Sequence, residues 1–124
     1  MKSPLAYVLI AVTIAFTVTG QLLVKHGTQQ LGSFPRSLAE AFPFILTALT
    51  NVWILVGLGC AVMAALAWIG AVSLSEISFA YPFMGLAIVL VVALSPLVVG
   101  ESVPAARWIG VALVCAGLFI TTRT

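Results

Sequence analysis

Four long stretches of apolar residues dominate the chain, at about residues 4–24, 52–74, 77–99 and 105–122. Each is close to the roughly 20 residues that an α-helix needs to cross the hydrocarbon core of a bilayer. Apolar and polar residues do not alternate in them, as they would in the strands of a membrane β-barrel. The pattern therefore predicts an all-α membrane protein whose four transmembrane helices form a compact bundle, with residues 1–124 as a single domain.

The connections between these stretches differ in length. Residues 75–76 and 100–104 leave room only for tight turns, so the helices on either side of each turn are expected to be antiparallel neighbours. The first connection, at about 26–51, is longer, and its part 37–50 is apolar apart from a glutamate and a proline. That part is either a short helix lying in the membrane interface or an early extension of the second span.

Composition indicates that lipid is the solvent of this chain. It is 63% hydrophobic and only 6% charged, whereas soluble domains typically carry about 25% charged residues. The formal net charge of +2 is too small to indicate a nucleic-acid partner. The first apolar run is too long for the core of a cleaved signal peptide, and no small-residue cleavage site follows it.

The basic residues specify orientation in the membrane only weakly. One side of the predicted bundle holds Lys2 and Arg123, and the other holds Lys25, Arg36 and Arg107. Orientation follows an excess of such residues on the cytoplasmic side, and here the two sides are nearly balanced. Either the orientation is weakly specified or both orientations are used, and the second alternative permits an antiparallel pair of subunits.

Polar residues in the first helix lie on one face. Thr13, Thr17, Gln21 and Lys25 recur every four residues, the spacing that places side chains above one another on a helix. They either form hydrogen bonds between packed helices or line a cavity that binds substrate, and Gln21 and Lys25 are larger than packing requires. Lys25 lies near the end of the span, where its ammonium could simply extend to the interface.

A second candidate region lies in the third helix. Pro82 lacks a backbone donor, which predicts a kink and leaves the carbonyl near Ser78 without its usual partner. Ser78 and Tyr81 share a face beside that kink. The segment is either a simple bend or part of a substrate-binding site.

The fourth helix carries two glycines on one face. Gly110 and Gly117 are seven residues apart, a spacing that suits close contact between helices. Four helices leave little room for a transport pathway within a single subunit. We therefore expect this face to form a dimer contact rather than internal packing.

Several kinds of chemistry are not indicated. The three acids, Glu40, Glu76 and Glu101, all lie in connections or at helix ends, whereas a proton-driven cation exporter needs a carboxylate at membrane depth. Cys60 and Cys115 lie in apolar runs without metal-ligand spacing, which is typical of buried thiols. The sequence shows no nucleophile–base pair, glycine-rich phosphate loop or metal cluster, so we expect neither an enzyme nor a cofactor.

Over nearly its whole length the chain resembles the four-helix branch of the drug/metabolite transporter superfamily. The small multidrug resistance family is similar in having a glycine followed five residues later by lysine, here Gly20 and Lys25, and in the motif FAYPFMG. It is also similar at the GES turn (100–102) and at IGVALVCAG (109–117), which forms the dimer contact in that family. Alignment on the first motif places the essential membrane glutamate of that family at Thr17, so the residue expected for proton coupling is missing.

The paired four-helix flippases for undecaprenyl-phosphate aminoarabinose also resemble the chain. The shared motifs are GQLLVK, AYPFMGL and GESVPAARWIGV, and these flippases too carry small or hydroxyl residues in place of the glutamate. The resemblance implies a multi-pass protein of the bacterial inner membrane, a similar four-helix subunit as homo- or heterodimer partner, and a polyprenyl phosphate bearing a polar head as substrate. Thr17 and Gln21 would offer that head neutral hydrogen bonds, while Lys25 or Arg107 would attract its phosphate.

Three functional hypotheses follow. The leading one is a transporter or flippase subunit that moves a lipid-linked anionic amphiphile by alternating access. The alternative is an exporter of cations or small metabolites of the multidrug-resistance type, in which Glu76 would have to serve as the coupling acid. The third is a non-transporting subunit that scaffolds a membrane enzyme.

Overall fold

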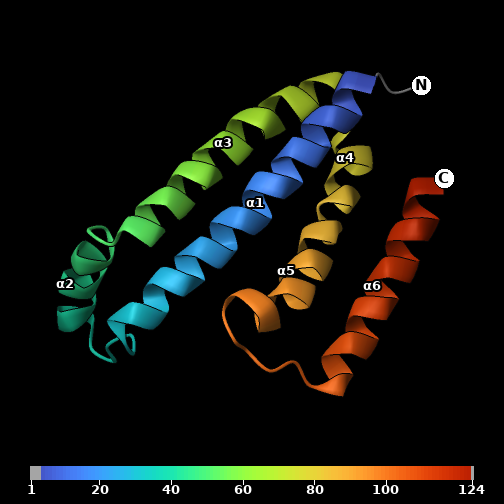
Figure 1. Ribbon diagram of the computed structural model, residues 1–124. Coiled ribbons are helices and arrows are strands. Elements are labelled where there is room, and N and C mark those ends of the chain that lie inside the picture. Colours follow the sequence, from blue (N-terminus) through green and yellow to red (C-terminus); the bar gives the residue numbers. More distant parts are fainter. Residues whose placement is uncertain (1–3, 124) are drawn as a thin grey trace.

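The computed structural model describes residues 4–123, and across them the regular secondary structure is α-helical (Figure 1). Lys2, which enters the charge balance above, lies outside the described residues. Four stretches are long and apolar enough to cross a membrane, which confirms the predicted fold class. In chain order the helices are α1 (Pro4–Leu31), α2 (Leu38–Ala48), α3 (Val52–Leu74), α4 (Ile77–Phe83), α5 (Gly85–Val98) and α6 (Ala105–Arg123).

The first helix is longer than its apolar stretch. α1 continues to Leu31, so His26 lies inside the helix and not in the connection, where the hydrophobic pattern placed it. Lysine, glutamine and leucine after residue 24 are good helix formers, and hydropathy marks where the apolar stretch ends rather than where the helix ends. Gly32, with φ of +87°, directly follows the helix in the left-handed conformation that commonly terminates helices.

The first connection contains a separate short helix, α2, and the alternative of an extended second span is wrong. The Ser37 hydroxyl accepts a hydrogen bond from the Glu40 N–H at 3.3 Å at the start of α2. The Asn51 side chain then accepts from the N–H groups of Trp53 and Ile54 at the start of α3. Because each helix has its own N-cap, the chain leaves one helix and begins another.

The third span is interrupted. α4 ends at Phe83 and α5 begins at Gly85, with Met84 between them donating its N–H to the Tyr81 carbonyl at 2.9 Å. This three-residue bond is tighter than the four-residue bond of an α-helix. The interruption lies two residues beyond Pro82, which itself cannot donate to the chain one turn earlier.

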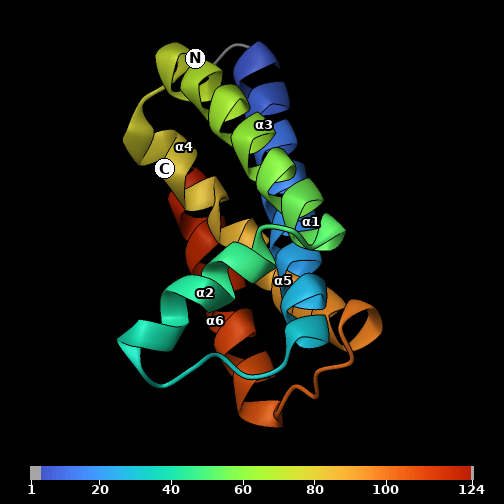
Figure 2. The same ribbon diagram turned by 90° about the vertical axis from the view of Figure 1, so that its left-hand side faces the viewer.

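Helix α1 is the centre of the packing. It lies along α3 and also contacts α5, while α6 contacts α4 and α5 at the other side of the molecule (Figures 1 and 2). A Cβ added to Gly20 would meet the Gly57 carbonyl oxygen at 2.8 Å, and a Cβ on Gly57 would meet the Gly20 oxygen at 2.8 Å. The two backbones therefore approach as closely as only glycine permits.

One face of α1 forms most of the hydrophobic core. Its buried residues recur every four positions and pack against small residues of the other helices. The members of this core are Ile10, Ile14, Val18, Leu22, Ala71, Ala80 and Ala87. The predicted polar stripe lies on the neighbouring face of the same helix, so a site on that face would border the core directly.

Candidate functional site: a neutral cavity between α1, α3 and the broken span

A cavity of about 820 Å³ lies between α1, α3, α4 and α5, and Leu118 of α6 reaches it. Its size is within the range typical of small-molecule sites. Among its lining residues are Thr13, Thr17, Gly20, Gln21, Val24, Gly57, Ala61, Ala64, Ala65, Trp68, Tyr81, Pro82, Met84 and Gly85.

The polar groups of this cavity are neutral. Thr13 is buried and its hydroxyl already donates to the Leu9 carbonyl at 2.7 Å, so it is tied to its own helix. Thr17 is half-buried and Gln21 is exposed, and both line the cavity. Tyr81 adds a phenol from α4. The residues that line the cavity include no charged side chain, so it is suited to hydrogen bonding rather than to ion pairing.

The space exists because the facing surfaces carry small side chains. On α3 the lining includes Gly57, Ala61 and Ala65, which leave room opposite the threonine and glutamine of α1. Farther along α3, Trp68 meets the Tyr81 ring edge-on, with ring centroids 6.0 Å apart. A polar wall on α1 and an aromatic pair between α3 and α4 thus border one cavity.

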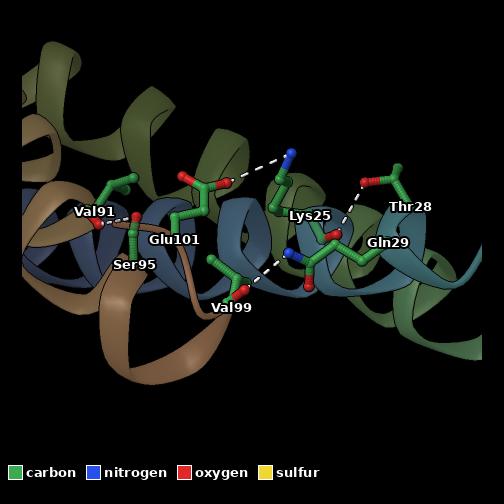
Figure 3. A network of polar contacts seen from close by, with 7 residues as sticks. All are labelled: Lys25, Thr28, Gln29, Val91, Ser95, Val99 and Glu101. Atoms are coloured by element: carbon green, nitrogen blue, oxygen red, sulfur yellow. Dashed lines mark hydrogen bonds and ion pairs between the residues drawn. The ribbon is translucent and has the colours of Figure 1, made fainter. Parts of the chain in front are cut away.

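Lys25 is separated from the rest of the predicted stripe. Its ammonium lies 3.5 Å from the Glu101 carboxylate of the α5–α6 connection, and the Gln29 amide donates to the Val99 carbonyl at 2.8 Å (Figure 3). Lys25 lines a second pocket of about 600 Å³ at the end of α1, together with Gln29 and Ser33. The predicted stripe is thus divided between the neutral cavity, which contains Thr13, Thr17 and Gln21, and a second pocket, which contains Lys25.

Other predicted site residues lie apart from both pockets. Ser78 is exposed on α4 and Arg107 is exposed in the first turn of α6, and neither lines either pocket. A Cβ added to Gly110 or Gly117 would meet nothing within 4 Å, so both glycines face open space in the single chain. Their predicted role as a dimer contact stays a prediction.

Sequence reasoning missed Glu101 and Trp68 as site residues. From the sequence, Glu101 is recognisable only as an acid outside the spans, although the turn 100–104 is predicted on the same side of the bundle as Lys25. The opposite charges of Lys25 and Glu101 on one side of the predicted bundle were the signal that could have indicated this ion pair. Trp68 gave no comparable signal, because a tryptophan in an apolar span is equally compatible with packing. Among residues 4–123, no group of three or more His, Cys, Asp or Glu could hold a metal.

The spans and the cavity define a small multi-pass membrane protein with a cavity whose polar lining residues are neutral. The chain is 29% identical over 103 residues to the probable 4-amino-4-deoxy-L-arabinose-phosphoundecaprenol flippase subunit ArnE of Pseudomonas savastanoi pv. phaseolicola, covering 83% of this chain and 84% of that protein. It is 28% identical to the corresponding ArnE protein of Pseudomonas syringae pv. syringae, over 90% and 94% of the two chains. It is a distant homologue of the ArnE flippase subunits, members of the small four-helix branch of the drug/metabolite transporters. No family model and no solved structure matches the chain.

Proposed function

We propose that the protein is a subunit of a flippase in the bacterial inner membrane. It moves a lipid-linked anionic amphiphile, of the polyprenyl-phosphate sugar type, by alternating access between two four-helix subunits. The relatives are named as flippase subunits and not as enzymes, and both come from Pseudomonas. The word subunit in their names supports a partner chain for this protein as well.

The neutral cavity is the observation that carries this proposal. The hydroxyl of Thr17, the amide of Gln21 and the phenol of Tyr81 offer hydrogen bonds to the hydroxyls of a sugar. The rest of the wall is mostly apolar, as in typical small-molecule sites. A polyprenyl tail stays in the lipid, so only the head group needs the cavity.

The absence of a lining acid argues against cation export. An exporter that exchanges a cation for protons needs a carboxylate where both bind. The resemblance to the small multidrug resistance family puts that glutamate at Thr17, which lines the cavity. Glu76, the acid left for that role, precedes α4 at the end of the span and is not among the lining residues.

Reconstitution tests the proposal. Liposomes containing the protein and a fluorescent polyprenyl-phosphate sugar should show faster movement of the probe between leaflets than protein-free liposomes, measured by its accessibility to a membrane-impermeant quencher. Glu76→Gln should leave that rate unchanged. Proton-coupled export of quaternary ammonium or guanidinium, lost in Glu76→Gln and without movement of the lipid probe, would contradict the proposal.

A further inference from the structure

The Lys25–Glu101 ion pair lies where the polar wall of the cavity ends. Lys25 follows Gln21 by one helical turn on the same face of α1, about 6 Å farther along the axis. Its Nζ atom is 3.5 Å from Glu101 Oε1, and the two side chains are 52% and 40% exposed (Figure 3). A head group whose sugar lies against Gln21 would therefore have its phosphate within reach of this pair.

We propose that the second pocket is the phosphate subsite of the transported lipid and that Glu101 is its specificity-determining residue. In this arrangement the Glu101 carboxylate competes with the phosphate for the ammonium of Lys25. A neutral or cationic head group cannot displace the carboxylate, whereas a phosphate can. The inference rests on the proposed function, because it names the subsite that recognises the anionic part of the substrate.

The lining of the second pocket suits one phosphate group. Lys25 is the charged residue among those that line it. Thr28 and Ser33 also line it, and the Thr28 hydroxyl donates to the Lys25 carbonyl at 2.9 Å. The pocket lies along the last two turns of α1, where the helix dipole places partial negative charge. An anion would therefore depend on Lys25 for its attraction to this pocket.

The competition is readily reversible. An ion pair exposed to this extent is weak, because water screens it and two long side chains must be ordered to form it. A phosphate presents more acceptor oxygens to the ammonium than the carboxylate does. The hydrogen bond from Gln29 to the Val99 carbonyl holds the α5–α6 connection against α1 even when the ion pair is broken. Glu101 therefore remains close enough to pair with Lys25 again.

Binding of defined probes to the full-length protein in nanodiscs tests the inference. The probes are decaprenyl phosphate, the neutral decaprenol and inorganic phosphate. Glu101→Gln should bind decaprenyl phosphate about two- to fivefold more tightly than the wild type, the range expected for release of an exposed ion pair. Lys25→Gln should bind it at least about tenfold more weakly, because a hydrogen bond to a charged group is lost.

The control and the double variant make the result specific. Glu40→Gln removes an exposed acid from the first turn of α2 and should leave the affinity unchanged, since Glu40 lies outside the second pocket. In the Lys25→Gln background, Glu101→Gln should have no effect. Decaprenol should bind all variants alike, and competition by millimolar inorganic phosphate would support recognition of the phosphate itself.

Three outcomes would overturn the inference. These are unchanged or weaker binding in Glu101→Gln, an equal gain in Glu40→Gln, and no phosphate-dependent binding by any variant. A misfolded protein cannot show a gain in affinity, so the Glu101→Gln result stands by itself. Lipid movement without these effects would overturn the subsite alone, whereas Lys25-dependent binding without lipid movement would overturn the proposed function alone.

Discussion

At the scale of single residues, Thr17 distinguishes this chain from the cation exporters that its sequence resembles. Its hydroxyl lines the cavity at the place where the resemblance to the small multidrug resistance family puts a glutamate. A hydroxyl exchanges hydrogen bonds but no proton near neutral pH. We therefore propose that Thr17 takes part in recognising sugar hydroxyls rather than in alternating between a bound proton and a bound cation.

Replacing Thr17 with valine tests this role. Thr17→Val keeps the shape of the side chain and removes one hydrogen bond, typically about 0.5–1.5 kcal/mol. We expect lipid movement to slow by about two- to tenfold in the liposome assay. Thr19→Val is the matched control, because Thr19 is exposed on α1 away from the lining residues, and it should retain the wild-type rate. Equal rates in the two variants would count against the assignment of Thr17.

At the scale of the elements, the α1–α3 pair is closely packed, whereas the third span is interrupted. At the contact between Gly20 of α1 and Gly57 of α3, the two backbones meet directly, with no side chain between them that could change its rotamer. The third span has a discontinuity at Met84 beside Pro82, where backbone hydrogen bonding changes. A rigid pair facing an interrupted helix would allow the cavity between them to change shape while α1 and α3 stay together.

Alanine substitutions at glycines of these two helices test the rigid pair. Gly20→Ala or Gly57→Ala would force a Cβ to within 2.8 Å of a backbone oxygen, which typically costs about 1–3 kcal/mol through overpacking. We expect lower midpoints in detergent unfolding monitored by circular dichroism.

Gly59→Ala is the control for that experiment. A Cβ at Gly59 meets nothing within 4 Å, and alanine is favoured over glycine in a helix by up to about 1 kcal/mol. Its unfolding midpoint should therefore be unchanged or higher. A loss of stability at Gly59 equal to that at Gly20 would show that helix propensity, and not the close contact, governs these positions.

At the scale of the whole molecule, α6 is the least buried of the four candidate membrane spans among the described residues. It packs on α4 and α5, yet within residues 4–123 none of its side chains is buried. A lipid-facing helix needs no further cover, but small residues on one face give a second helix close access. Gly110 and Gly117 provide such a face, and we propose that it receives the partner subunit.

Leucine substitution on this face tests the assembly. Gly117→Leu should leave the unfolding midpoint of the single chain unchanged or higher, because its side chain would enter open space and leucine is a better helix former than glycine. It should reduce cross-linked dimer in liposomes severalfold. Gly59→Leu also enters open space, on α3, and should leave dimer formation intact. Dimer yields that fall equally in the two variants, or in neither, would contradict a contact through Gly117.

Much of the architecture follows from the chain considered one segment at a time. Backbone groups in lipid must be satisfied within the segment, so a long apolar run can only be a helix, and its length fixes the number of spans. The polar line on α1 follows from the periodicity of a helix, as does its proximity to the core stripe that contains Ile14 and Val18. The position of the break followed from Pro82 only approximately, because neighbouring residues decide which hydrogen bonds survive.

The sequence alone therefore determined the membrane environment, the four spans and a polar face on α1 that contains no acid, because these depend on local composition and helical period. Only the tertiary structure decided which polar residues share a site. It placed Thr17 and Gln21 in one cavity with Tyr81, left Ser78 and Arg107 outside it, and brought Glu101 to Lys25. These outcomes depend on how helices pack across large separations in sequence, where a glycine contact or a turn sets distances that no local pattern encodes.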